Sequence, residues 1–382
     1  MHYRLWALGV AFALALASSC HDEVGGSGTA PPTTTTGGSG GAADAGSDAG
    51  ADAPADALPP AKPTGNLVVW RLHLGDPSED PDSPPAEQLG MDLDGKDSKI
   101  TSPDHCTLYP GAKPSDVKLD GEDGIDNSLA RNIVPLVKGP APTFATDVNK
   151  AIWPDGGTTL LFRTSLPELL RDGYVQTYIY RTLALPAPPP LLDGSDVFPI
   201  DQACLLGACG AGGAGPDGGS ALSLDDALFH DPAAALAGDV LAIELPRLRL
   251  RLTAGDYPLA MTIRHARIEM TLSDDRSRAL QGTIAGVVPI EEALRDVQTM
   301  LLHSPLKVPC GSSVVDDAIE KAQDIHYDKD KDIISNDAGE DCNAISVGIG
   351  FEAVAALYGE PQPDPNPLAS CPGPEPVEPC DD

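Results

Sequence analysis

Alternating apolar residues between positions 239 and 272 constrain the fold of this chain more than any other feature. Apolar residues occupy odd positions over 241–245 and even positions over 248–252, with Pro246 at the change of phase. The segment 261–272 repeats this behaviour and changes phase at His265. Since successive side chains of a strand face opposite sides, a period of two predicts half-buried β-strands. A change of phase moves the apolar set to the other face, so we expect each strand to bulge or bend there.

Other segments carry weaker patterns of the same kinds. We expect further strands at 67–74, 158–164, 174–185, 279–288 and 344–351, and helices at 126–134, ended by Pro135, at 289–302 and from about 313. In the last strand the apolar residues alternate with Ser346, Gly348 and Gly350, which indicates that another segment packs closely on that face. Together these elements predict a β-rich α+β fold, a twisted antiparallel β-sandwich with a few short helices.

The polar face of the alternating region carries a row of arginines. Two interpretations are open: a cationic stripe that binds an anionic partner, or side chains that pair with the protein's own acidic loops. The arginines are Arg247, Arg249, Arg251, Arg264 and Arg267.

The first twenty residues carry an export pattern. Arg4 precedes an apolar run at 5–17, which is too short to span a bilayer and is typical of a secretory signal peptide. Ser18 and Ser19 before Cys20 resemble the lipobox of bacterial lipoproteins, although Leu16 stands one place before the usual leucine position. This resemblance implies that residues 1–19 are removed and that Cys20 anchors the protein to a membrane through lipid, with the outer membrane as the default. The alternative is an ordinary secretory signal cleaved after a small residue.

Composition divides the rest of the chain. Residues 20–65 are rich in Gly, Ala, Thr and Pro and hold almost no large apolar side chain, which predicts a disordered tether. Residues 66–360 contain the material for a core, and a division into two subdomains would fall in the Pro- and Gly-rich segment 186–220. Residues 361–382 form a Pro-rich acidic tail. The net charge of −32 argues against a nucleic-acid partner, since phosphate binding needs clustered cations.

The chain has eight cysteines. If Cys20 carries lipid, an odd number remains in an exported chain, where thiols are normally paired. Cys106 is then left over, either as an inert buried thiol or as a reactive one. No C-x-x-C motif occurs, so we expect neither a zinc site nor a thioredoxin-like site. Proximity in the sequence predicts the disulfides Cys204–Cys209, Cys310–Cys342 and Cys371–Cys380.

Three segments concentrate carboxylates at short spacing. Calcium prefers about six to eight oxygen ligands, and Asp alternating with Gly lets a turn wrap around one ion. The third segment resembles an EF-hand loop at its first ligand positions, but Ile333 replaces the turn glycine and Gly339 the bidentate glutamate. The alternative is a set of solvated acidic loops. The candidate calcium ligands are Asp92, Asp94 and Asp97, then Asp120, Asp123 and Asp126, and finally Asp328, Asp330, Asp332 and Asp337.

Two motifs carry a wider resemblance. Together with the lipobox and the tether, GEDGIDN at 121–127 and DCNAISVGIGF at 341–351 resemble a group of uncharacterised exported lipoproteins from Gram-negative soil bacteria. The resemblance implies no particular activity. The pairing of the motifs suggests that the two acidic segments meet in the fold around one ion.

These features predict a surface-tethered lipoprotein of the cell envelope with structural calcium. It would serve as a non-enzymatic module that binds a protein or glycan or supports the envelope. The alternative is an extracellular hydrolase of polysaccharide or peptide that uses acidic residues as general acid and base. Converging carboxylates in a concave pocket would favour the hydrolase.

Overall fold

The structure is a computed structural model that describes residues 65–99, 104–113, 117, 120–139, 141–166, 172–205, 222–255, 257–313 and 315–368. The expected signal peptide and the tether up to residue 64 lie outside these residues. Cys20, Cys209, Cys371 and Cys380 also lie outside them.

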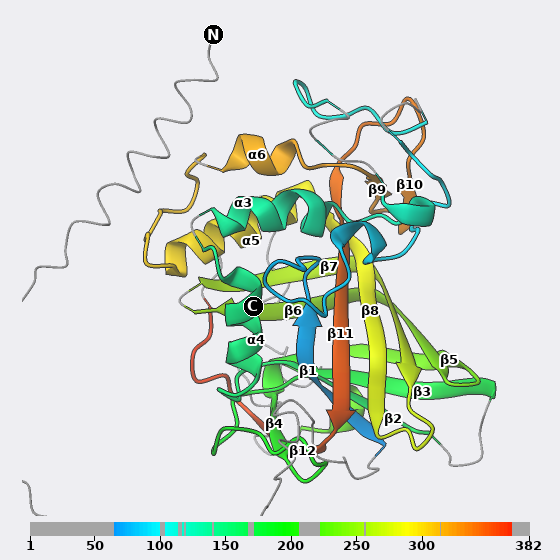
Figure 1. The fold of residues 1–382 in the computed structure, drawn as a ribbon, viewed down its shortest axis with the longest axis vertical. Coiled ribbons are helices and arrows are strands. Elements are labelled where there is room, and N and C mark those ends of the chain that lie inside the picture. The colour runs from blue at the N-terminus through cyan, green and yellow to red at the C-terminus, as the bar shows by residue number, and fades with distance from the viewer. Residues whose placement is uncertain are drawn as a thin grey trace, which may run out of the picture. The chain divides into compact units, whose positions relative to one another are not determined.

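Within the described residues, eight strands form one antiparallel sheet in the order β1-β11-β8-β7-β6-β5-β3-β2, and β1 also pairs with β2, so the sheet closes into a barrel (Figure 1). The β-rich class with a few short helices is confirmed, but the strands enclose the core as one closed layer instead of two stacked sheets. The barrel strands are β1 (Asn66–His73), β2 (Leu160–Thr164), β3 (Asp172–Arg181), β5 (Phe229–Ala237), β6 (Val240–Ala254), β7 (Tyr257–Leu272), β8 (Arg278–Pro289) and β11 (Ala344–Ala355).

The hairpin of β6 and β7 contains the predicted changes of phase. Leu245 pairs with Ala266 and Arg247 with Arg264, so the register is unchanged across Pro246. His265, on the opposite strand, has a φ of +47°. Between β7 and β8 the register shifts in the same region. The hairpin therefore bends at this point, and its far half leaves the barrel wall to pack against helices.

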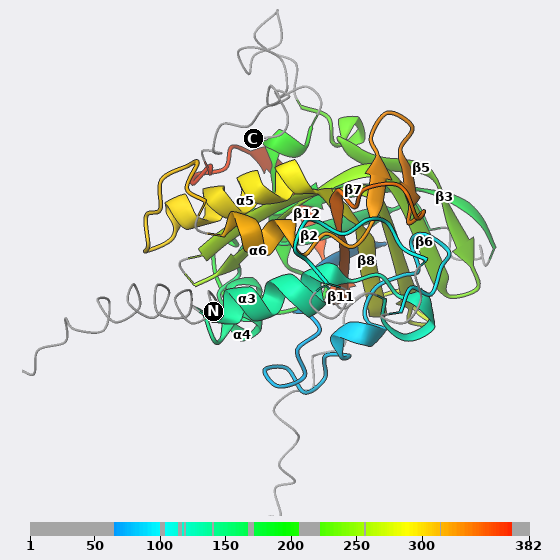
Figure 2. The same ribbon diagram turned by 90° about the horizontal axis from the view of Figure 1, so that it is seen from above.

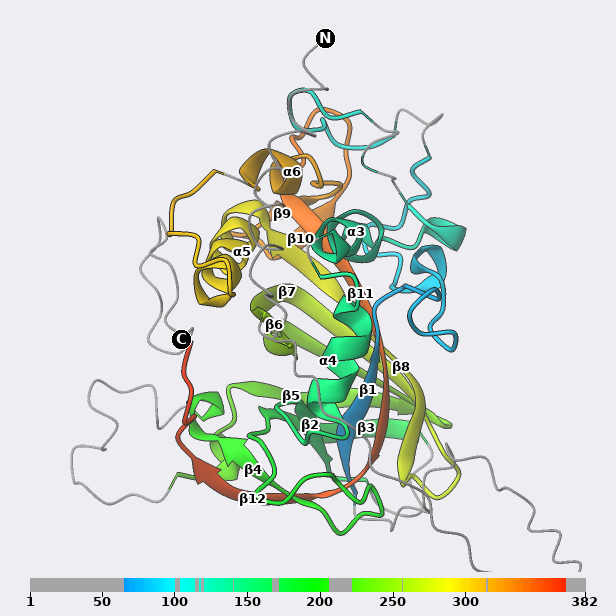
Figure 3. The same cartoon turned by 60° about the vertical axis from the view of Figure 1, so that its left-hand side comes forward.

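The helices lie against the barrel and its extended hairpin (Figures 1 and 3). Helix α4 contacts both β1 and β6, which stand on opposite sides of the barrel, and Asn149 of α4 exchanges two hydrogen bonds with Leu72 of β1. Helix α5 packs on β7, with α6 beside it (Figure 2). The helices are α3 (Val134–Lys138), which follows a π-helical turn at Leu129–Ile133, α4 (Phe144–Ile152), α5 (Ile290–His303) and α6 (Asp316–Glu320).

The prediction that Pro135 ends the first helix is wrong. Pro135 instead stands in the first turn of α3, where its missing N–H has no helical partner to lose.

Two pairs of short strands complete the described fold: β9 (His326–Asp328) with β10 (Ile333–Ser335), and β4 (Val197–Asp201) with β12 (Leu357–Gln362). Strand β12 runs parallel to β4 and carries the chain past the expected domain end at 360. Asp364 beyond it pairs with Arg251 and lies 3.7 Å from Arg181. The first residues of the expected tail are thus part of the fold. Strands β3 and β5 pair directly, so the segment 186–220 does not divide the sheet.

The disulfide pattern differs from the prediction. Cys106 pairs with Cys342 across a sequence separation of 236 residues, so the expected Cys310–Cys342 bond is wrong. Cys310 is disulfide-bonded, but to another partner. Among the described cysteines, Cys204 is a buried free thiol, which contradicts the pair Cys204–Cys209. Proximity along the chain failed because a disulfide requires spatial proximity and suitable Cβ geometry, which the barrel connections decide.

Three arginines of β6 and β7 pair with the protein's own acids. Arg264 lies 2.9 Å from Glu292 on α5, and Arg249 lies 3.8 Å from Asp296 on the same helix. Arg251 pairs with Asp364. These contacts support the interpretation of the arginine row as internal ion pairs.

Candidate cation site

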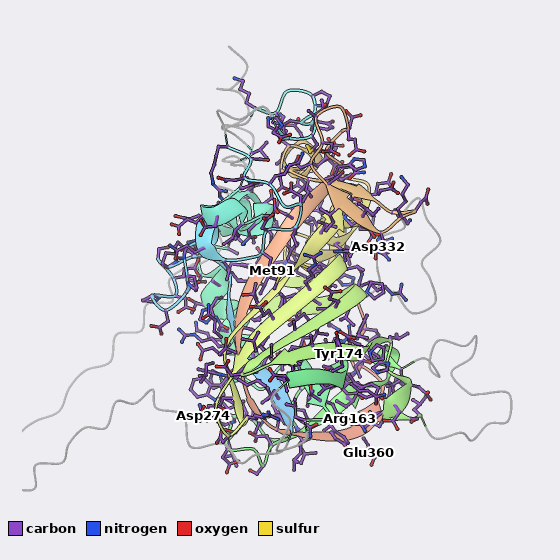
Figure 4. All side chains as sticks on the ribbon, turned by 90° about the vertical axis from the view of Figure 1, so that its right-hand side faces the viewer. Met91, Arg163, Tyr174, Asp274, Asp332 and Glu360 are labelled. Atoms are coloured by element: carbon purple, nitrogen blue, oxygen red, sulfur yellow. A yellow bond between two sulfur atoms is a disulfide. The ribbon has the colours of Figure 1, made fainter. Side chains whose placement is uncertain are left out.

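The first two acidic segments converge on one point. Asp92, Asp94 and Asp126 each offer a carboxylate oxygen, and these oxygens lie within 4.8 Å of one another. Two hydrogen bonds hold the two acidic segments together. The N–H of Asp126 donates to Met91 O at 3.0 Å, and the N–H of Leu93 donates to Asp126 Oδ2 at 2.8 Å. Figure 4 labels Met91 beside this group, which we call the acidic cluster.

Two glycines allow the loops to approach. The turn after Asp92 has Gly95 at a φ of +76°, and Gly95 N donates to Asp92 Oδ1 at 2.7 Å. Gly124 has a φ of +81°, and a Cβ there would collide with the carbonyl oxygen of Lys96 and lie 3.4 Å from Asp92 Cγ. The missing side chain of Gly124 therefore leaves room for a backbone oxygen at the edge of the cluster.

Burial makes the negative charges of the acidic cluster energetically costly. Asp126 is only 1% exposed, and its Oδ1 has no hydrogen-bond partner among the described residues. Burial, with the charges of Asp94, Asp120 and Asp324, raises the pKa of Asp126 to about 10. Burial and the charge of Asp94 raise the pKa of Asp120 to about 6. Burial also raises the pKa of Asp94, whose Oδ2 likewise lacks a partner in the described part of the chain.

The repulsion among the carboxylates of the acidic cluster can be relieved in one of two ways. A proton can neutralise one carboxyl, or a cation can bind between the carboxylates and satisfy the unpartnered oxygens. The donor set is all oxygen, from the three carboxylates. Hard oxygen donors favour calcium or magnesium over transition metals. Asp92 is exposed, so one side of the cluster faces solvent.

The other predicted ligands of these two segments differ in position. Asp120 is buried and electrostatically coupled to Asp94 and Asp126, so it stands beside the cluster. Asp97 is exposed and pairs with Lys99 at 2.6 Å. Asp123 is exposed as well, at a φ of +52°. Because neighbouring residues of an irregular loop point in different directions, only some carboxylates of each segment face the same point.

The third acidic segment lies in and around the β9–β10 hairpin, where Figure 4 labels Asp332. Asp328 pairs with Lys331 at 2.5 Å, and Asp332 accepts from the hydroxyl of Tyr327 at 2.8 Å. Asp330 is exposed, and Asp337 accepts from Lys96 at 2.9 Å. Within the described residues, no second group of three metal-ligating side chains converges as the acidic cluster does.

The two motifs of the wider resemblance meet, but among the described residues the C-terminal acidic segment adds no carboxylate to the acidic cluster, so the two segments do not share one group of ligands. Asn127 Nδ2 donates to Gly348 O, and Gly348 N donates to Asn127 Oδ1, both at 3.0 Å. Ser128 N donates to Ser346 Oγ at 2.8 Å. The small residues of β11 thus accept the 127–128 segment, as their pattern predicted.

Two residues near the cluster carry no recognisable sequence pattern. Asp324 is buried, accepts from Ser346 N at 2.9 Å, and has a pKa raised to about 7, mainly by burial. Asn336 is fully buried and contacts Cys106, Ser98 and Lys96. A single Asp or Asn outside a repeating pattern gives no signal of burial, so only the fold identifies them.

A cleft of about 750 Å³ adjoins the acidic cluster through Asp120. Charges of both signs line it, including Lys99, Arg131 and Glu87. The cleft gives a ligand access to Asp120.

Among the described residues, no helix combines the length and the apolar composition that crossing a membrane requires. No protein-family model, curated protein or solved structure matches this chain.

Proposed function

We propose that this protein is an exported, lipid-anchored module of the cell envelope whose barrel is stabilised by one calcium ion at Asp92, Asp94 and Asp126. It acts by binding or by supporting the envelope, without catalysis. One observation carries the calcium site: Asp126 Oδ1 is buried and has no described partner at the point where three carboxylates converge. The anchor rests on Ser18, Ser19 and Cys20.

The physical basis is charge compensation. A carboxylate without a counter-charge is costly to bury, and two more carboxylates within 4.8 Å increase the cost. A divalent cation bound between the three carboxylates attracts each of them, so the electrostatic interaction at the site becomes favourable. Because the unfolded chain cannot assemble the three ligands, binding stabilises the folded state, by about 2.7 kcal/mol at a free calcium concentration of 100 times Kd.

The test compares the melting temperatures of the wild-type protein and Asp126→Asn, with calcium and with a chelator. In chelator we expect the variant to melt higher, since Asn keeps an oxygen for the Leu93 amide but adds no charge. In saturating calcium we expect the wild type to melt higher, because only it binds the ion. Asp97→Asn removes an exposed acid of the same loop and should respond to calcium as the wild type does. Equal melting temperatures of the wild type with and without calcium would instead favour a shared proton.

The anchor has a separate test. Radiolabelled palmitate should enter the wild-type protein in an exporting bacterial host and should not enter Cys20→Ala. Equal labelling of both proteins, or labelling of neither, rejects the lipid anchor and leaves an ordinary secretory signal.

An extracellular hydrolase is a second candidate, and one observation favours it: Asp120 borders the cleft and has a pKa raised to about 6, as a general acid requires. Its test is hydrolysis of dye-labelled casein and of a dye-labelled soluble glucan. A hydrolase would release dye, and Asp120→Asn would lose the activity while keeping the fold. Absence of release by the wild type on both substrate classes counts against this candidate.

A further inference from the structure

The side chain of Asn336 connects the Cys106–Cys342 disulfide to the loop that carries Asp94. The N–H of Cys106 donates to Asn336 Oδ1 at 2.5 Å. The Nδ2 of Asn336 lies 3.4 Å from Ser98 Oγ. All of these groups are buried or half-buried. The side chain of Asn336 therefore joins the disulfide to Ser98, in the loop that carries Asp94.

A second set of contacts also connects the loop of Asp94 to the segments that the disulfide joins. Lys96 Nζ donates to Asn336 O at 3.0 Å and to Asp337 Oδ1 at 2.9 Å, and Lys96 N donates to Asp94 Oδ1 at 2.8 Å. Ser98 N donates to Asp120 Oδ2, and Ser98 Oγ donates to Asp104 O at 2.8 Å. The loop that carries Asp94 is thus held from behind by the two segments that the disulfide joins.

The disulfide also fixes these two segments to each other. Thr107 N donates to Glu340 O at 2.7 Å, and Cys342 N donates to Thr107 O at 2.9 Å, on either side of the sulfur bridge. Opening the bridge would leave only this short pairing and the Cys106–Asn336 hydrogen bond, among the contacts described above, to hold the 104–107 segment against 336–342. The position of the Asn336 amide would then vary, and with it the position of Asp94.

We propose that the Cys106–Cys342 disulfide and Asn336 position the loop of Asp94 for the cation, so that disulfide formation and cation binding favour each other. The inference rests on the proposed calcium site and adds its regulation. Residues that hold metal ligands from behind typically change metal affinity by about 10- to 100-fold. Coupling between two equilibria is reciprocal, so the effect on disulfide opening must equal the effect on calcium affinity.

The first experiment measures the calcium Kd by isothermal titration calorimetry. We expect Kd to rise by about tenfold or more in Asn336→Ala and in the double variant Cys106→Ser/Cys342→Ser. The matched control is Cys204→Ala, which removes a buried cysteine that belongs to the barrel core and forms no disulfide. Its Kd should equal that of the wild type.

The second experiment needs only the wild-type protein, so it does not depend on whether a variant folds. Each dithiothreitol molecule gives two electrons and two protons to the disulfide, which becomes two thiols while the reagent closes its own ring. At equilibrium, alkylation and peptide mass spectrometry report the fraction of Cys106 and Cys342 that is reduced. Saturating calcium should raise the ratio of reduced to oxidised dithiothreitol at half-opening by the same factor as the change in Kd.

The outcomes separate the two proposals. If the wild-type protein shows no calcium binding, the cation site fails and the coupling fails with it. If the wild type binds calcium, but Kd is unchanged in both variants and the dithiothreitol ratio does not move, the site stands and the coupling is wrong.

Discussion

Asn127 and Gly348, which stand 221 residues apart, exchange two hydrogen bonds of 3.0 Å through the side-chain amide of Asn127 and the backbone of Gly348. The same amide also donates to Leu89 O at 2.5 Å. The side-chain amide of Asn127 therefore forms with β11 the two hydrogen bonds that a neighbouring strand would form. It also joins the segments around Leu89, Asn127 and Gly348. A side chain at position 348 has no room, because its Cβ would lie 2.5 Å from Leu89 O. This junction holds the acidic cluster against the barrel.

Asn127→Ala should destabilise the protein by about 2 to 4 kcal/mol, since it leaves several buried backbone groups without partners. These groups are the carbonyls of Leu89 and Gly348 and the N–H of Gly348. Urea denaturation of the calcium-saturated protein measures the change. Gln281→Ala removes an exposed amide on β8 and should stay within about 0.5 kcal/mol of the wild type. A similar loss in both variants would contradict the special role of Asn127.

Gly282→Ala should destabilise the barrel interior by about 1 to 3 kcal/mol, because a Cβ there collides with the ring of Phe351. Phe351 in turn stacks on Phe162 with ring centroids 5.5 Å apart, so the ring cannot easily move away. In a double-mutant cycle, Gly282→Ala should lose less stability when Phe351 is replaced by Leu. Thermal denaturation of the four proteins gives the coupling, and strict additivity would show that the collision is relieved elsewhere.

Asp296 should make stability fall as the pH rises from about 4 to about 7. Burial raises the pKa of Asp296 to about 7, although Arg249 and Arg295 oppose the shift; the charge of Glu292 adds to it. Between the unfolded value of 3.8 and the folded value, the folded protein holds a proton that the unfolded chain has lost, so each unit of pH reduces the free energy of unfolding. The full effect is about 2 to 4 kcal/mol.

Asp296→Asn removes the contribution of this carboxyl to the pH dependence of the free energy of unfolding. We expect the variant to match the wild type near pH 4 and to exceed it in stability at pH 8, measured by urea denaturation at both values. Asp226→Asn, at an exposed position, is the control and should change neither. A wild-type advantage at pH 8 would mean that the ion pair with Arg249 outweighs the burial of the carboxylate.

Asp364→Asn should destabilise the protein by about 3 kcal/mol or more, because it removes a negative charge from between two buried arginines. The side chains of Arg251 and Arg181 are only 10% and 12% exposed. Asp201, fully buried, remains as the partner of Arg181, so Arg251 bears most of the loss. Asp155→Asn, an exposed acid that lines the same pocket as Arg251 and Asp364, should have little effect. The comparison uses midpoints of urea denaturation, and an unchanged midpoint for Asp364→Asn would show that the ion pairs of Asp364 contribute little to stability.

Local patterns predicted the elements that depend on local periodicity. The alternation in β6 and β7, the change of phase at Pro246, and the small-residue face of β11 are properties of neighbouring residues, so they are visible in the chain alone. The residue types of the acidic cluster were visible for the same reason. Which carboxylates converge was not visible, because Asp94 and Asp126 come from separate loops, whereas Asp97 in the first loop pairs with Lys99.

The sequence by itself determined that this chain is β-rich, where most of its long strands lie, and which residues could bind a hard cation, since all three follow from side-chain chemistry and short-range spacing. It did not predict strand β5. Only the tertiary structure decided that the strands close into a barrel, that Cys106 bonds to Cys342, and that Asp126 Oδ1 is buried beside Asp92 and Asp94 with no partner among the described residues. These outcomes depend on contacts between residues far apart in the chain. Such contacts are selected by the packing of the whole core, and no local pattern records them.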